Sequence, residues 1–153
     1  MFSPDRAAFH EAAANGSNLI PVAQSWPADL ETPLTTWIKV GADHPPGVLL
    51  ESVEGGETLG RWSVIACDPL WTATAHQDRL VQRWRNGREQ VMEGNPFHSL
   101  RRCLAPYRCA SLAGLPPLGQ LYGMWGYELI QWIESSVPVH PRTPSDPPDG
   151  IWM

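Results

Sequence analysis

The stretch LLESVEGGETLGRWS, from Leu49 to Ser63, decides how the middle of the chain folds. An apolar run precedes its glycines and the run RWSVIAC follows them, which is the pattern of two strands joined by a turn. Gly55 and Gly60 have the outer spacing of a phosphate-binding loop, but the Lys and the Ser or Thr that must follow are missing. A strand pattern comes next, so no helix N-terminus faces a phosphate. The stretch predicts a β-hairpin and excludes a nucleotide site.

Helix signals lie on both sides of this hairpin. Ser3 and Thr32 each precede a proline, which predicts helices that these two residues cap. The first helix should end at Asn15-Gly16 and the second at Gly41. Asn95-Pro96 opens a further helix, and YELIQWIE near the end of the chain reads as helical.

Short strands fill most of the remaining sequence. Leu19 to Trp26 is a β-like run at a sheet edge, and strands are predicted in LWTATAHQ, RLVQRWR, REQVME and GQLYGMWG. Asn86-Gly87 is a two-residue hairpin turn. This order of elements predicts an α+β fold with a mainly antiparallel sheet and flanking helices. Five of the eight tryptophans fall within apolar patterns and are expected in the core, namely Trp37, Trp71, Trp84, Trp125 and Trp132.

Composition restricts the class of protein. The 153 residues fit one domain, residues 1–153, and a net charge of -5 without a basic stripe argues against nucleic acid as a partner. The N-terminus lacks the apolar core of a signal peptide, and no apolar run is long enough to cross a membrane. Three cysteines favour a reducing compartment and a cytoplasmic protein. Cys103 and Cys109 lack metal-ligand spacing, so they are expected to be packing or surface thiols.

Catalytic patterns are absent from the sequence. No Ser-His-Asp order, close carboxylate pair or HExxH motif occurs, and the five histidines are scattered. We therefore expect neither catalytic residues nor a metal site in this chain. Residues 137–150 are rich in proline and predict a linker or an extended crossing. The final Ile151-Trp152-Met153 reads as the start of a strand, so the chain is expected to be a fragment of a longer protein.

Glu51 and Ser52 are the polar pair in the opening stretch. Neighbouring residues of a strand point to opposite faces, so one small ligand on one face does not contact both side chains. One interpretation is a solvent-facing Glu51 beside a small Ser52. The other is a ligand site that uses the Ser52 hydroxyl and the Glu51 backbone.

Three segments in this order resemble the N-terminal part of the anthranilate synthase component I family. They are LIPVAQSWPADLETPLTTWIKV, LLESVEGGETLGRWSVIACDP and GQLYGMWGYELIQWIE, and the resemblance extends from about Asn18 to the C-terminus. It implies that the chain is half of the larger sandwich of chorismate-utilising enzymes, whose C-terminal catalytic domain is absent here. One apolar face should then be exposed. The chain is also similar to the component I of aminodeoxychorismate synthase, a paralogue of the folate pathway.

The resemblance implies an activity for the full-length protein. Members convert chorismate and ammonia to anthranilate and pyruvate in tryptophan biosynthesis and use magnesium. A glutamine amidotransferase subunit supplies the ammonia, and the chorismate-binding domain holds the catalytic residues. This chain is then expected to be inactive alone and to bind no cofactor itself.

The resemblance also implies half of a feedback site for L-tryptophan, an inhibitor. Ser52 would meet the amino acid with its hydroxyl, Glu51 would contribute its carbonyl, and Arg61 would meet the carboxylate. Leu50 and Trp62 would flank the indole ring. The full set of implied effector-site residues is Leu50, Glu51, Ser52, Gly60, Arg61, Trp62 and Ser63. Two other functions stay open, a freestanding amino-acid-binding module and a domain that only docks the amidotransferase.

Overall fold

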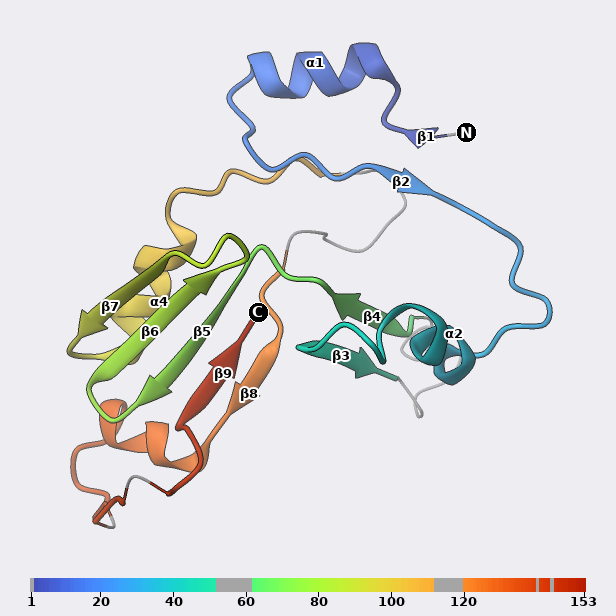
Figure 1. Cartoon of the computed structure of the whole chain (residues 1–153). Coiled ribbons are helices and arrows are strands. Elements are labelled where there is room, and N and C mark those ends of the chain that lie inside the picture. The colour runs from blue at the N-terminus through green and yellow to red at the C-terminus, as the bar shows by residue number, and fades with distance from the viewer. Residues whose placement is uncertain (1, 52–61, 112–119, 140, 144) are drawn as a thin grey trace. The chain divides into compact units, whose positions relative to one another are not determined.

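The structure, a computed structural model, describes residues 2–51, 62–111, 120–139, 141–143 and 145–153. The chain forms two compact units (Figure 1). Unit 1 comprises Met1–Pro27 and Leu100–Leu121, and unit 2 comprises Ala28–Ser99 and Tyr122–Met153.

Unit 1 begins with a strand and a helix. Strand β1 (Phe2–Ser3) pairs antiparallel with β2 (Ala23–Gln24), and helix α1 spans Arg6–Ala14. The predicted cap Ser3 is wrong, because Ser3 lies in β1 and Asp5 caps the helix. The Asp5 carboxylate accepts a hydrogen bond of 2.9 Å from the Ala8 N–H, which satisfies one of the free amides of the first turn.

A polar junction joins two segments of unit 1 that lie far apart in sequence. The Asn18 side-chain amide donates to the Pro106 carbonyl, and its oxygen accepts from the Arg108 N–H, both at 2.7 Å. Leu19 forms a parallel β-bridge with Cys109. The predicted strand from Leu19 to Trp26 is thereby reduced to this bridge and β2, since Pro21 in between has no N–H to donate.

In unit 2, helix α2 (Pro33–Val40) begins as predicted at Thr32. The Thr32 hydroxyl accepts from the Thr35 N–H at 3.1 Å, and the Thr35 hydroxyl accepts from the Thr32 N–H at 2.8 Å. These reciprocal bonds satisfy two backbone donors and fix the start of the helix. Gly41 closes it, also as predicted.

Strands β3 (Gly47–Leu50) and β4 (Val64–Cys67) form an antiparallel pair in the place of the predicted hairpin. The remaining strands make a five-stranded sheet in the order β7-β6-β5-β9-β8, with every neighbouring pair antiparallel. Their bounds are β5 Trp71–His76, β6 Arg79–Trp84, β7 Glu89–Glu93, β8 Gly123–Trp125 and β9 Gly150–Trp152. The predicted α+β class with a mainly antiparallel sheet is confirmed. The turn at Gly87, with φ at 83°, joins β6 to β7 as predicted.

One face of the five-stranded sheet carries the core. Side chains of alternate strand positions are buried there, namely Trp71, Ala73, Ala75, Leu80, Gln82, Met92 and Trp152. Helix α4 (Pro96–Leu104) starts with the buried Pro96, and its Phe97 ring stacks on Trp125 with centroids 5.6 Å apart. The six residues Tyr127–Trp132 form a 3-10 helix, η1, rather than the α-helix suggested by YELIQWIE.

The tryptophans divide differently from the prediction. Trp125 is 54% exposed, because β8 is an edge strand with a neighbour on one side only. Trp152 is 1% exposed, because β9 lies between β5 and β8. The core role assigned to Trp125 is therefore wrong, and Trp152, which was not among the five tryptophans expected in the core, is a core residue.

Gly123 permits β8 to approach β9 closely. A Cβ atom at this position would lie 2.1 Å from the Ile151 carbonyl oxygen and 2.8 Å from the Trp152 Cα. Both contacts are to backbone, which cannot rotate away, so only glycine fits at residue 123 without a shift of the strands.

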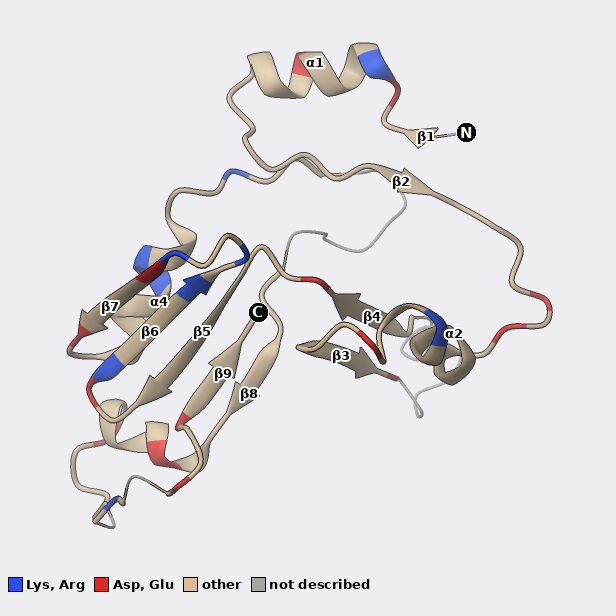
Figure 2. Cartoon of the chain, viewed as in Figure 1, with Lys and Arg blue, Asp and Glu red and all other residues tan. Residues whose placement is uncertain are grey.

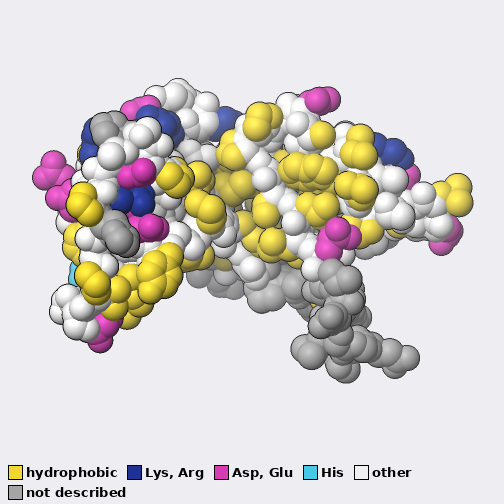
Figure 3. Space-filling view, turned by 90° about the horizontal axis from the view of Figure 1, so that it is seen from below, with side chains coloured by type: hydrophobic (Ala, Val, Ile, Leu, Met, Phe, Trp, Pro, Cys, Tyr) yellow, Lys and Arg dark blue, Asp and Glu magenta, His cyan; other side chains and the backbone are white. Residues whose placement is uncertain are grey.

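The opposite face of this sheet is open and carries a row of apolar side chains. The pairing register places Met124, Ile151, Thr74, Val81 and Val91 side by side across all five strands. Met124, Val91 and Ile151 are 49%, 46% and 39% exposed. Figure 3 shows that hydrophobic side chains gather in patches on the molecular surface it displays.

The cysteines of the chain differ in how deeply they are buried. Cys103 in α4 is buried, and burial raises the pKa of its thiol to about 11, whereas Cys109 is exposed. At pH 8 the Cys103 thiolate is then about a thousandth of the total, since the gap is about three pH units. We expect an aromatic disulfide reagent to label Cys109 rapidly and Cys103 only after unfolding in urea. In a Cys67→Ser background, which leaves only these two thiols, the Cys109→Ser variant should lose the fast phase; a retained fast phase would mean that Cys103 is accessible.

Candidate functional site

The β3–β4 hairpin packs one face against α2. Gly47 and Cys67 lie on this face, since a Cβ on Gly47 would lie 2.5 Å from the Trp37 ring. The Cys67 thiol donates to the Val40 carbonyl at 3.4 Å. Leu50 pairs with Val64 on the other face of the hairpin, away from the helix. The hairpin thus has one covered face and one face available for contacts.

Four of the seven predicted effector-site residues are brought together at one end of this hairpin. Leu50 is the last residue of β3 and is 48% exposed, and Glu51 follows it. Trp62, 42% exposed, and Ser63 lie just before β4. Because Leu50 pairs with Val64, Glu51 and Ser63 continue from the same end of the two strands. An apolar and a polar residue from each strand therefore lie at this end of the hairpin.

The other three predicted residues, Ser52, Gly60 and Arg61, lie outside the described residues. The roles of the Ser52 hydroxyl and of Arg61 as partner of the carboxylate, and the place of Gly60 in the effector site, stay predictions.

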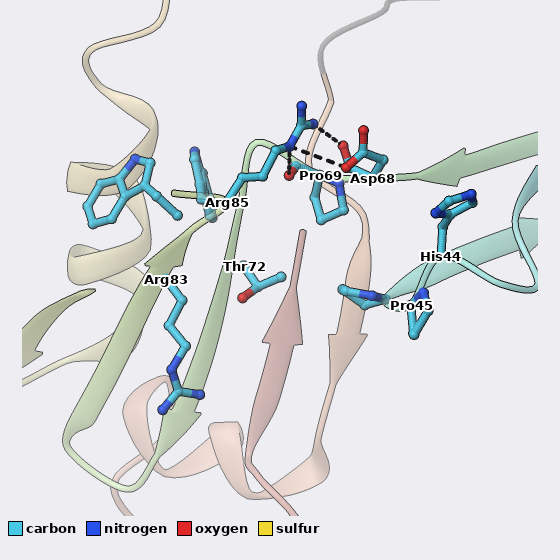
Figure 4. Close-up of a pocket in the computed structure, with 10 residues that line it drawn as sticks. His44, Pro45, Asp68, Pro69, Thr72, Arg83 and Arg85 are labelled. Atoms are coloured by element: carbon cyan, nitrogen blue, oxygen red, sulfur yellow. Dashed lines mark hydrogen bonds and ion pairs between the residues drawn. The ribbon is translucent and has the colours of Figure 1, made fainter. Parts of the chain in front are cut away.

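Unit 2 also contains a cavity of about 230 Å³ at the end of the five-stranded sheet where β5 begins and β6 ends (Figure 4). The α2–β3 connection contributes prolines and His44 to one wall, and the β4–β5 connection contributes Asp68 and Pro69 to another. The full lining is His44, Pro45, Pro46, Asp68, Pro69, Trp71, Thr72, Arg83, Trp84 and Arg85.

Two arginines set the electrostatics of this cavity. Arg85 is held over the β4–β5 connection, since its guanidinium donates to the Asp68 and Pro69 carbonyls and pairs with the Asp68 carboxylate at 3.2 Å (Figure 4). Arg83 pairs through Nε with Glu89 at 2.5 Å, on the side of the sheet edge. Asp68 adopts a φ of 53°, a left-handed conformation that is uncommon for a residue with a side chain. This conformation turns the Asp68 carbonyl and carboxylate together toward Arg85.

Sequence reasoning did not find this cavity. Its residues come from the α2–β3 connection, the β4–β5 connection, the start of β5 and the end of β6. In the sequence, the one local sign of this cavity is the RWR pattern of Arg83, Trp84 and Arg85. The pairing of Thr72 with Arg83 across β5 and β6, which places both side chains on one face, follows from the register and not from either segment alone.

Charged side chains elsewhere give no metal site in the described part of the chain. Acidic and basic residues are spread over separate elements (Figure 2). Among the residues described, no three His, Cys, Asp or Glu side chains lie close enough to hold a metal ion. Glu128, Asp146 and Asp149 surround Arg142. No magnesium ligand is therefore assigned among the residues that the structure describes. None of the described helices combines the length and apolar character that a bilayer crossing requires.

Comparison with known proteins bears on the whole chain. No model of a protein family matches it. It is 51% identical over 154 aligned residues to anthranilate synthase component 1 of Synechocystis, an alignment that covers 100% of this chain and 30% of the relative. The protein of the same name from Pseudomonas aeruginosa is 34% identical, covering 97% of this chain and 31% of the relative. That of Acetivibrio thermocellus is 34% identical over 87% of this chain.

These alignments include the β3–β4 hairpin, both sheets and the crossing into β9, since two of them cover almost every residue. The chain spans about 30% of the length of these relatives, so it corresponds to one part of them. Relatives from distant bacteria share one name and align with the same chain. The chain is therefore homologous, over almost its whole length, to one part of proteins named anthranilate synthase component 1.

Proposed function

We propose that this chain is the N-terminal, feedback-regulatory part of an anthranilate synthase component I, and that it supplies half of a site for L-tryptophan. The observation that carries the proposal is the exposed end of the β3–β4 hairpin, where Leu50, Glu51, Trp62 and Ser63 lie, in a chain 51% identical to part of an anthranilate synthase component 1. Tryptophan needs an apolar slot for its indole and polar groups for its ammonium and carboxylate. The hairpin end offers both kinds of group.

The reaction itself belongs to the rest of the protein in this proposal. The whole enzyme would convert chorismate and ammonia to anthranilate and pyruvate with magnesium, using ammonia from a glutamine amidotransferase subunit. Tryptophan at the hairpin would oppose chorismate binding with a coupling free energy of roughly 1–3 kcal/mol, and chorismate would weaken tryptophan binding by the same factor.

Substitution of Ser52 tests the proposal. In the full-length protein, Ser52→Ala removes the hydroxyl that would bind the tryptophan head group. We expect the tryptophan concentration for half-inhibition to rise about tenfold, which corresponds to about 1.4 kcal/mol, while uninhibited activity stays unchanged. The measurement is anthranilate fluorescence against tryptophan concentration. Ser135→Ala, at an exposed turn position, is the matched control; equal inhibition of the Ser52 variant and this control would refute the assignment.

A second test separates a regulatory half from a freestanding amino-acid-binding module. If another domain completes the pocket, the isolated chain should bind tryptophan weakly or not at all, because half of the contacts are missing. Isothermal titration of the 153-residue chain with tryptophan measures this directly. Micromolar or tighter binding would favour the freestanding module.

Two other functions have their own tests. Product analysis of the full-length enzyme separates anthranilate from aminodeoxychorismate, and the names of the relatives favour anthranilate. A pull-down of the amidotransferase subunit with and without this segment tests docking as its sole role.

A further inference from the structure

We propose that the cavity at the end of β5 and β6 binds a small organic carboxylate with an apolar body. This site is separate from the hairpin end of the proposed effector site and does not depend on it, because none of the residues that line the cavity belongs to that set. The cavity volume of about 230 Å³ suits a single-ring compound rather than a peptide or a nucleotide.

The cavity has more hydrogen-bond donors than acceptors. Arg83 engages Glu89 through its Nε, so its terminal amino groups remain to meet a carboxylate in a bidentate arrangement. Thr72 lies directly opposite Arg83 in the register, and its hydroxyl is the nearest second donor on that face (Figure 4). Asp68 is the acidic residue that lines the cavity. Because its carboxylate is paired with Arg85, it repels a bound anion less than an unpaired carboxylate would.

The remaining walls are apolar and fixed in position. Pro45, Pro46 and Pro69 present rings without N–H groups. Trp71 and Trp84, which pair on the opposite face of the sheet from Thr72 and Arg83, reach the cavity at the ends of β5 and β6. These surfaces suit an aromatic or aliphatic ring. Figure 4 shows His44 and Pro45 on one side of the cavity and Thr72 and Arg83 on the other, so a ring would lie between these two walls.

Asp68, with its left-handed backbone, forms part of the cavity wall. Its carbonyl accepts from the Arg85 guanidinium, and the Arg85 N–H donates to the Leu70 carbonyl at 3.1 Å. These bonds hold the β4–β5 connection against the end of β6. Strained residues of this kind persist where the surrounding structure holds them and are enriched at ligand sites.

The experiment uses benzoate as the carboxylate probe and benzyl alcohol as the neutral probe of similar size. Backbone amide signals of the 15N-labelled chain are followed by NMR during titration. We expect benzoate to shift the signals of Thr72, Arg83 and Arg85 saturably and benzyl alcohol to shift them little. Non-saturable shifts, or equal affinity for both probes, would overturn the proposal.

Arginine variants locate the contact. Arg83→Gln should weaken benzoate binding about tenfold or more. Arg79→Gln is the matched control, because Arg79 lies on the same strand and the same face but outside the cavity, and it should leave the affinity unchanged. Equal loss in both variants would mean that benzoate responds to net charge alone, which would also overturn the proposal. Amide spectra of both variants without ligand establish that they fold.

Discussion

Replacement of Trp152 by alanine is expected to lower the free energy of unfolding of this chain by about 3–5 kcal/mol. Trp152 is the largest fully buried side chain, and β9 places it between Ala73 of β5 and Gly123 of β8. Its ring meets Trp125 edge to face with centroids 4.9 Å apart. The small neighbours cannot expand into the space, and a β-sheet held on both sides relaxes little, so the variant keeps a cavity. Urea unfolding followed by far-ultraviolet circular dichroism measures the loss.

Trp152→Phe is the matched control for this loss. The Trp152 indole N–H is buried and has no hydrogen-bond partner within the described residues, so phenylalanine removes an unsatisfied donor along with some ring volume. We expect this variant to lose much less stability than Trp152→Ala. Equal losses in the two variants would show that the ring volume at this position contributes little, contrary to the packing around it.

The local elements of the fold were predictable because their signals are local. Thr32 and Gly41 bound α2 through contacts within a few residues, and Gly87 turns β6 into β7 with its own φ angle. Asp5 shows the limit of this reasoning. Ser3 and Asp5 both suit a helix cap, and the pairing of β1 with β2, about twenty residues away, draws Ser3 into a strand.

The burial of tryptophan depended on strand order, which single segments do not encode. Trp125 and Trp152 both lie in short apolar runs, but Trp125 is in an edge strand and Trp152 in an inner one. The insertion of β9 beside β5, rather than at the end of the sheet, is a contact between residues about 75 positions apart. Apolar periodicity predicts that a residue faces a core, but the sheet order decides how much of it is covered.

In the candidate sites, too, the parts formed by neighbouring segments were predictable from the sequence, and the parts formed by distant segments were not. The end of the β3–β4 hairpin was predictable from the opening stretch because its two strands are adjacent in sequence. The cavity beside Arg83 was not, because it combines the α2–β3 and β4–β5 connections with two strand ends. Strand alternation predicts opposite faces for Glu51 and Ser52; the structure places Glu51 directly after β3, and Ser52 lies outside the described residues.

The connection between η1 and β9 is held by a buried ion pair. Arg142, whose side chain is 14% exposed, pairs with the Asp149 carboxylate at 2.9 Å, and Asp149 is 1% exposed. Glu128 lies 3.3 Å from the same guanidinium, and Asp146 lies 3.9 Å from it. Asp149 also accepts a hydrogen bond from the Gln77 N–H and donates its own N–H to the Ala75 carbonyl at 2.8 Å. The end of the proline-rich stretch 137–150 is therefore tied to the end of β5 through Asp149 and through Gly150, which pairs with Ala75.

Arg142→Ala is expected to lower the free energy of unfolding by about 3–5 kcal/mol, because it leaves the Asp149 carboxylate buried without its cation. The double variant Arg142→Ala with Asp149→Asn should recover part of this loss, since the neutral amide keeps an oxygen for Gln77 and carries no charge. Arg83→Ala, which breaks an exposed pair with Glu89, should cost at most about 1 kcal/mol. Urea unfolding of the three variants measures these values. A double variant less stable than Arg142→Ala alone would mean that packing of the Arg142 side chain, rather than the buried charge of Asp149, holds this connection in place.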